Sequence, residues 1–300
     1  MNTEKIYTLK EDTEYGFLRV DPSPTDAEIR DFYAREFYSG DYKNFNNSSL
    51  EVQERDGDYH ELQRQLLLDS VESLLGDSIK GREVLDFGCG WGLTLQFLSK
   101  KGAQCYGVDP APEAVDYCKI QGLDVSVGDI DDFGEFSLKT FDVILMQNVL
   151  EHLKDPVRAL KMLTSRLKLG GVIVVAVPND FNQLQLCATE LLNLRQWWVA
   201  PPAHLSYFNR DSLSRVMEAC GLTVERTECS FPIEMFLLFG QDYISNPQLG
   251  RDAHEKRMAF EMALAKTGKT AVLRDFYKSL GQAGLGRILT AFAVKPTNKN

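Results

Sequence analysis

An alternation of short apolar strands with helices, beginning at Gly81, constrains the fold of this chain more than any other feature. Strands are predicted where β-branched and other apolar residues run together, and helices where apolar residues recur every three or four positions. The predicted strands are 84–87, 105–108, 124–127, 141–146 and 172–177, and the predicted helices are 93–100, 112–120 and 155–167. Continuous apolar strands that alternate with helices favour a mostly parallel sheet covered on both faces. The sequence therefore predicts an α/β fold.

The segments around this alternation predict four units along the chain. Residues 1–58 are polar, rich in aromatic residues and broken by prolines, so we expect an N-terminal helical cap. A core over 59–232 begins with a helix that carries leucines at helical spacing and ends with a sixth strand. A helical insertion over 233–282, expected to be a lid or a subunit interface, precedes a seventh strand and a tail over 283–300.

Charge and hydropathy exclude several classes of protein. The chain has 33 Lys and Arg against 43 Asp and Glu, a net charge of −10, and lacks the basic cluster expected of a nucleic-acid binder. Its longest apolar run, Val172–Val177, is far shorter than the roughly 20 residues that cross a bilayer. The N-terminus lacks the apolar core of a signal peptide. We therefore expect a soluble, cytoplasmic protein that binds no nucleic acid.

A glycine loop follows the first strand, at the edge of the sheet where such folds bind ligands. Its sequence is Asp86-Phe87-Gly88-Cys89-Gly90-Trp91-Gly92, and the glycines let a ligand approach the backbone closely. A dinucleotide fingerprint would place its third glycine where Leu93 stands. The Asp86 carboxylate would repel a pyrophosphate and attract a cation. We therefore expect the ammonium and sulfonium groups of S-adenosylmethionine (SAM) rather than NAD.

Two further carboxylates follow the second and third strands. Asp109, before Pro110, can accept hydrogen bonds from both hydroxyls of a ribose, a role that SAM and NAD sites share, or it can cap the turn that follows. Asp129 can accept a hydrogen bond from an adenine amino group while Ile130 lies on the ring; the alternative is a solvated acid in an acidic loop. The sequence leaves both choices open.

Taken in order, these motifs resemble the class I SAM-dependent methyltransferases over residues 66–296. The resemblance is carried by Val84–Gly92, Gly107–Pro110, Gly128–Ile130, Phe141–Ile144, Asn148–Leu153 and Leu167–Gly171. It implies a Rossmann-like seven-stranded sheet with a single antiparallel strand near the edge, and SAM as the cofactor. The implied cofactor contacts are Phe87, Gly88, Cys89 and Gly90 at the methionine, Asp109 and Pro110 at the ribose, Asp129 and Ile130 at the adenine, Gln147 and Asn148 beside the sulfonium, and Trp91 as a cover.

Methyl transfer to an oxygen requires the removal of a proton, which a histidine can accept near neutral pH. His152 follows the fourth strand, and we predict it as catalytic or, alternatively, as a side chain held by backbone at a helix end. His204, also predicted as catalytic, lies in a segment that resembles the substrate-side loop of small-molecule O-methyltransferases. Glu151 and His152 offer half of a metal site, and without a second pair at ligand spacing we predict no metal.

The methyl acceptor is the least constrained feature. The apolar segment Phe231–Gly240 predicts a substrate pocket or a homodimer interface. The segment Gly250–Met258 resembles methyltransferases of bacterial surface-polysaccharide assembly, which implies a sugar, sugar phosphate or nucleotide-linked glycan precursor. The Glu151-His152 segment is also similar to enzymes that methylate quinone-precursor phenols, and an amine is a further alternative. Outside this class, the competing hypotheses are a nicotinamide-dependent oxidoreductase and a non-catalytic SAM-binding protein.

Overall fold

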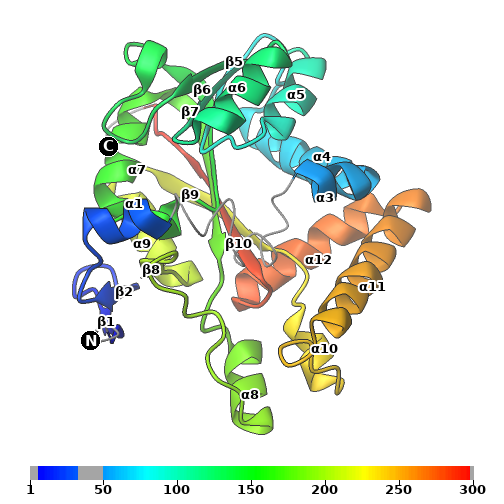
Figure 1. Cartoon of the computed structure of the whole chain (residues 1–300). Helices are drawn as coiled ribbons and strands as arrows, with labels where there is room; N and C mark the ends of the chain where they lie inside the picture. The colour runs from blue at the N-terminus through cyan, green and yellow to red at the C-terminus, as the bar shows by residue number, and fades with distance from the viewer. Residues whose placement is uncertain (1–5, 33–49, 298–300) are drawn as a thin grey trace.

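A seven-stranded sheet forms the centre of the computed structural model, which describes residues 6–32 and 50–297 (Figure 1). Its strands are β3 (Glu83–Phe87), β4 (Gln104–Asp109), β5 (Asp124–Val127), β6 (Phe141–Gln147), β7 (Leu167–Pro178), β9 (Thr223–Cys229) and β10 (Ile288–Val294). Their order is β5-β4-β3-β6-β7-β10-β9. Strand β10 is antiparallel to both β7 and β9, whereas the other neighbours run parallel. The predicted Rossmann-like fold, with its antiparallel strand near the edge, is confirmed.

Both faces of the sheet are buried, which explains why its strands are apolar at successive positions. In β6, Val143 and Leu145 pack on one face beneath the helices α4 (Gly57–Leu75) and α5 (Leu93–Lys100). Ile144 and Met146 pack on the other face. That face is covered by α7 (Pro156–Arg166) and α9 (Arg210–Ala219), while α6 (Pro112–Ile120) lies beside β4 and β5. Each such buried side chain contributes about 1.5–3 kcal/mol to stability.

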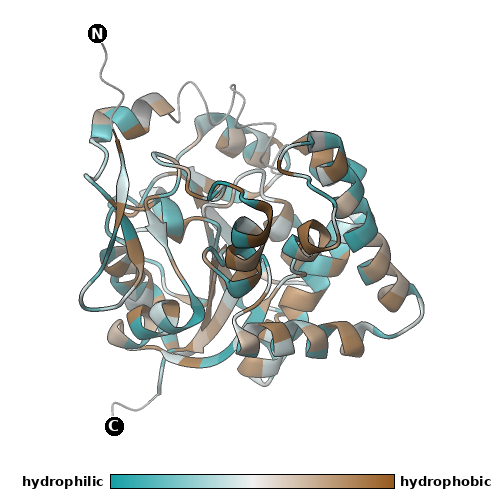
Figure 2. Ribbon diagram, turned by 90° about the horizontal axis from the view of Figure 1, so that it is seen from below, coloured by the Kyte–Doolittle hydropathy of each residue, from teal (hydrophilic) through white to brown (hydrophobic). Residues whose placement is uncertain are grey.

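The predicted helical insertion forms α10 (Glu234–Leu238), α11 (Pro247–Lys266) and α12 (Thr270–Ala283), and the last two pack on the core. Helix α12 lies against β9, where a Cβ on Gly281 would come within 2.3 Å of the Thr227 carbonyl oxygen. Helix α11 lies along α4, and buried Arg257 donates a hydrogen bond to the Tyr59 hydroxyl. The helices carry mixed hydrophilic and hydrophobic residues, as amphipathic covers of a core do (Figure 2). No helix in the described ranges is both long and apolar enough to span a membrane.

The N-terminal segment differs from the predicted helical cap. Strands β1 (Thr8–Glu11) and β2 (Leu18–Asp21) form an antiparallel hairpin, and β2 also pairs with β8 (Ser206–Tyr207). Helices α1 (Asp26–Phe32) and α3 (Leu50–Arg55) agree with the helical part of the prediction, and residues 1–5 and 33–49 lie outside the described ranges. The hairpin was missed because its strands are four residues long and largely exposed, so they lack the apolar alternation of a half-buried strand.

Candidate active site

The glycine loop lies where β3 and β4 end, and its backbone is tied to β4. Gly88 N–H donates to the Val108 carbonyl oxygen at 2.7 Å, and Gly90 N–H donates to Asp109 Oδ2 at 2.8 Å. Gly88 has a φ of +79°, and a Cβ there would lie 2.3 Å from Val149 Cγ2, so only glycine fits. Gly90 also has positive φ, but a Cβ there would meet no described protein atom within 4 Å. This side of the loop is therefore open to a ligand.

Asp86 is a buried carboxylate next to the last residue of β3. It is 3% exposed, and its Oδ1 has no hydrogen-bond partner among the described residues. Burial, reinforced by repulsion from Asp109, raises the pKa of Asp86 to about 8, while the charge of Arg64 on α4 acts in the opposite direction. A buried carboxylate without a bonded cation fits a site that receives a positively charged ligand group. The residues present therefore fit the ammonium end of SAM.

Asp109 holds the turn at the end of β4. Its Oδ1 accepts a hydrogen bond from Ala111 N–H at 2.9 Å, and its Oδ2 accepts the bond from Gly90. Burial raises the pKa of Asp109, and the two backbone hydrogen bonds partly offset this rise. The turn-capping alternative is thus present in the structure. Because each carboxylate oxygen has a second lone pair, the ribose role stays a prediction for Asp109, as does cofactor contact for exposed Pro110.

Asp129 closes its own turn after β5. Its Oδ1 accepts hydrogen bonds from the N–H groups of Asp131 and Asp132 at 2.8 and 3.1 Å, and the side chain is exposed. Ile130 is half-buried and packs against the main core. The arrangement matches the solvated-loop alternative for Asp129, and the adenine role of both residues stays a prediction.

The other predicted cofactor residues surround the loop. Phe87 is buried against the core, and Cys89 is buried beneath the loop. Trp91 is half-buried and meets the Tyr117 ring edge-on at 5.5 Å. Half-buried Gln147 ends β6, and Asn148 follows it, exposed and with a φ of +54°. Positive φ at a residue other than glycine is uncommon and often marks functional sites.

The structure brings Glu151, His152 and His204 together after the end of β6. Glu151 and His152 form the short 3₁₀ helix η3 (Leu150–His152), and His204 lies in the loop that leads to β8. His152 Nδ1 donates to the Ala203 carbonyl oxygen at 2.7 Å, and Leu205 N–H donates to the Glu151 carbonyl oxygen at 2.8 Å. The two imidazole rings meet edge-on, with centroids 5.1 Å apart. Both predicted catalytic histidines therefore lie in one cluster, and His152 also makes the backbone contact that was its alternative.

A buried polar network that the sequence analysis missed adjoins this cluster. Asp180 Oδ2 lies 4.0 Å from His204 Nδ1, and Arg287 donates a hydrogen bond to Asp180 Oδ1 at 2.9 Å. Gln185, on α8 (Gln183–Leu192), donates hydrogen bonds to Asp180 and to Glu234 on α10. Asp180 lies two residues after the end of β7, so the rule that placed the other polar residues at strand ends could have found it. Arg287 precedes β10, and only the antiparallel direction of that strand brings it to this edge.

Burial sets the protonation of the cluster. It raises the pKa of Glu151 to about 8, and it lowers the pKa of His152. Burial, followed by the charges of His152 and Arg287, lowers the pKa of His204 to about 3. Both imidazoles are therefore neutral near pH 7, and each has a lone pair that can accept a hydrogen bond from a hydroxyl or bind a cation.

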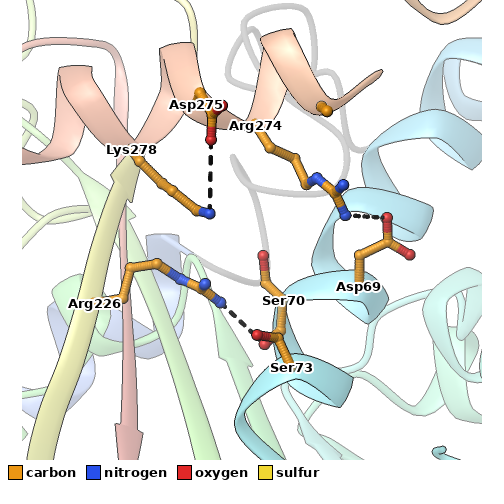
Figure 3. Close-up of a pocket in the computed structure, with 8 residues that line it drawn as sticks. Asp69, Ser70, Ser73, Arg226, Arg274, Asp275 and Lys278 are labelled. Carbon is orange, nitrogen blue, oxygen red and sulfur yellow. Dashed lines mark hydrogen bonds and ion pairs between the residues drawn. The ribbon is translucent and has the colours of Figure 1, made fainter. Parts of the chain in front are cut away.

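A separate polar hollow of about 230 Å³ lies by the edge strand β9, between α4 and α12 (Figure 3). Its cations are already engaged by protein groups. Arg274 pairs with Asp69 at 2.8 Å, Lys278 lies 3.9 Å from Asp275, and Arg226 donates to the Ser70 carbonyl oxygen. The Arg274–Asp69 pair joins α12 to α4, and the Arg226 hydrogen bond joins β9 to α4, so we interpret the hollow as a structural junction.

The family model described as "Methyltransferase domain" matches residues 59–227. A "Ubiquinone biosynthesis O-methyltransferase" of Xanthomonas oryzae pv. oryzae (strain PXO99A) is 32% identical over 118 residues, covering 37% of this chain and 48% of that protein. A protein of the same name from Alkalilimnicola ehrlichii (strain ATCC BAA-1101 / DSM 17681 / MLHE-1) is 28% identical over 120 residues, covering 38% and 48%. The chain thus spans about half the length of these curated relatives.

A solved structure supports the architecture. The plantazolicin methyltransferase BamL, in complex with a triazolic desmethylPZN analog and SAH, has a TM-score of 0.54 and 18% identity. The match covers 91% of this chain and 97% of that one. At this identity the likeness concerns the fold.

Asp86→Asn tests the burial of the carboxylate. Because the folded-state pKa is about 8 and the unfolded value is about 3.9, the stability that protonated Asp86 contributes is full below pH 4 and is lost as the pH rises to 8. Asparagine does not titrate, so the variant should not lose stability in this way as the pH rises. Between pH 5 and 8, the variant should gain free energy of unfolding relative to wild type by about 1 kcal/mol per pH unit in urea titrations. Exposed Asp124→Asn is the control, and equal pH dependence in all three proteins would contradict the assignment.

Proposed function

Since the chain belongs to the methyltransferase-domain family and SAM is its methyl donor, we propose that it transfers the methyl group to a hydroxyl oxygen of a small molecule. The observation that carries this proposal is the buried cluster of Glu151, His152 and His204 at the same edge of the sheet as the glycine loop. Methyl transfer needs the acceptor oxygen held in line with the activated methyl group, and a group that receives the hydroxyl proton. The cluster offers acceptors for that proton.

We propose the following roles for the chain's own residues. Asp86 and the open side of Gly90 bind the methionine end of SAM. Arg64, which is close enough to lower the pKa of Asp86, faces the carboxylate of SAM. Asp109 receives the ribose. His152 and His204 hold the acceptor hydroxyl and receive its proton. The two hydrogen bonds between η3 and the His204 loop fix the ring of His152 and the backbone on either side of His204, so little reorganisation is needed at the moment of reaction.

For the acceptor, we favour an uncharged aromatic hydroxyl of the quinone-precursor type. The names of the curated relatives support this choice. Electrostatics supports it too, because the carboxyl groups of Asp180 and Glu234 are buried beside Arg287, two acids to one cation, and disfavour a phosphorylated acceptor. An apolar hollow of about 360 Å³ is bordered by α8, α10 and α12, and its lining includes Leu184, Pro232, Met235, Leu238, Phe239, Phe276, Leu280 and Leu285. It can take an apolar part of the acceptor.

A glycan precursor is the second acceptor class. Its sequence support, Gly250–Met258, lies on α11, where Ala253 is buried, Arg257 bonds Tyr59 and His254 lies 4.0 Å from Asp56. These contacts hold α11 against α4, so packing explains some of the residues in this segment without a role in binding a glycan. Phe239 is 68% exposed at the rim of the insertion, which supports homodimer formation there as a separate proposal.

Binding of S-adenosylhomocysteine (SAH) tests the cofactor site. Calorimetry should show saturable binding to wild type, and Asp86→Asn should weaken it about tenfold or more because a charged hydrogen bond to the ammonium group is lost. Wild-type affinity should rise from pH 6 to pH 8 as Asp86 loses its proton, whereas the variant should follow only the titration of the ligand. Exposed Asp116→Asn should bind like wild type. Absence of SAH and SAM binding would contradict the proposal.

Methyl transfer tests the acceptor side. With methyl-labelled SAM, phenolic quinone precursors should become labelled, and nucleotide sugars should not. His204→Gln should lower kcat about 100-fold or more while leaving SAH affinity within about twofold, because the ring acts on the acceptor. Labelling of the sugars alone would overturn the choice of acceptor. Unchanged kcat in both His204→Gln and His152→Gln would overturn the proposed catalytic roles.

A further inference from the structure

The Glu151, His152 and His204 cluster has the composition of a metal site as well as that of a proton acceptor. One ligand atom from each residue lies within 4.8 Å of the others. The sequence supplied only the adjacent Glu151 and His152, and the fold adds His204 from a loop about fifty residues later in the chain. We propose that these three residues bind a divalent transition-metal ion such as Zn²⁺.

The ligand atoms are buried and oriented. Glu151 is 2% exposed, and its Oε2 and His204 Nδ1 have no hydrogen-bond partner among the described residues. The hydrogen bond from His152 Nδ1 to the Ala203 carbonyl fixes the proton on Nδ1, so the lone pair is on Nε2. Metal-binding histidines commonly make this contact with a backbone carbonyl, which sets the tautomer and the ring orientation. Small side-chain rotations would bring the ligand atoms to the roughly 3.4 Å that separates them around a bound ion.

The local charge favours a cation. The cluster contains one carboxyl group and two imidazoles. Asp180 and Glu234 add two buried carboxylates nearby, and Arg287 contacts both, at 2.9 and 3.9 Å. With the acids ionised, this group has three negative charges against one positive charge. A bound dication would offset the excess of negative charge.

The ligand types indicate which ion. Two imidazoles with one carboxylate suit Zn²⁺ and other transition metals, whereas Mg²⁺ and Ca²⁺ prefer oxygen ligands. The role rests on the proposed function: the ion would bind the acceptor oxygen and lower the pKa of its hydroxyl. The O–H bond then breaks and the proton leaves to water; the oxygen lone pair forms a bond to the methyl carbon, and the C–S bond pair returns to sulfur. When the ion is bound, the two imidazole rings would act as its ligands, and the ion rather than a ring would promote loss of the hydroxyl proton.

Cobalt titration of EDTA-treated full-length protein tests the site without any acceptor. Co²⁺ should bind at about one equivalent per chain, with visible absorption from mixed nitrogen and oxygen ligands, and Zn²⁺ should displace it. His204→Gln and Glu151→Gln should each weaken binding at least about tenfold. His254→Gln, a change of a histidine on α11, should bind Co²⁺ like wild type. Circular dichroism should show that the Glu151→Gln variant is folded.

Two results would overturn the metal site. One is binding well below one equivalent in wild type; the other is unchanged affinity in both cluster variants. SAH calorimetry on the same metal-free samples distinguishes an error in the metal site from an error in the proposed methyltransferase function. SAH binding without Co²⁺ binding would leave the methyltransferase proposal intact and remove the metal. Co²⁺ binding at the cluster without SAH binding would support the metal site and remove the cofactor assignment.

Discussion

The burial of carboxylates at one edge of the sheet is the constraint on which this site depends. Asp86 and Asp109 lie at the carboxyl ends of β3 and β4, and Glu151 and Asp180 follow β6 and β7; all four are nearly inaccessible to water. Burying a carboxylate costs free energy unless it gains hydrogen bonds or an opposite charge. Asp109 gains two backbone hydrogen bonds, and Asp180 gains Arg287. Asp86 and Glu151 each keep an oxygen without a partner among the described residues, so these two positions favour a ligand that brings positive charge.

The rest of the fold keeps these groups in place. The sheet buries apolar side chains on both faces, which offsets the cost of the acids, and the glycine loop is tied to β4 through backbone hydrogen bonds. The loop that carries His204 is held twice to η3 and continues into β8, which pairs with the N-terminal hairpin. The hairpin therefore supports the acceptor side of the site through the chain segment that carries His204. Such support from rigid elements is what a catalytic arrangement needs.

Much of the fold followed from the sequence, because the periodicity of buried strands and helices is a local property. Helices such as Leu93–Lys100 and Pro112–Ile120 were predicted with their observed bounds. The glycine loop and its carboxylate were found for the same reason. Arg287, Glu234 and the meeting of His152 with His204 depend on pairings between distant segments. The hairpin of β1 and β2 was missed because its four-residue strands are largely exposed and carry no apolar alternation.

A crystal structure of the complete protein with SAH tests the central claim most directly, because it shows what neutralises the buried carboxylate. The predicted result is an ammonium group within hydrogen-bond distance of Asp86, with the sulfur directed toward a space bordered by His152 and His204. An SAH molecule whose ammonium group makes no contact with Asp86, or whose sulfur points away from both rings, would contradict the account.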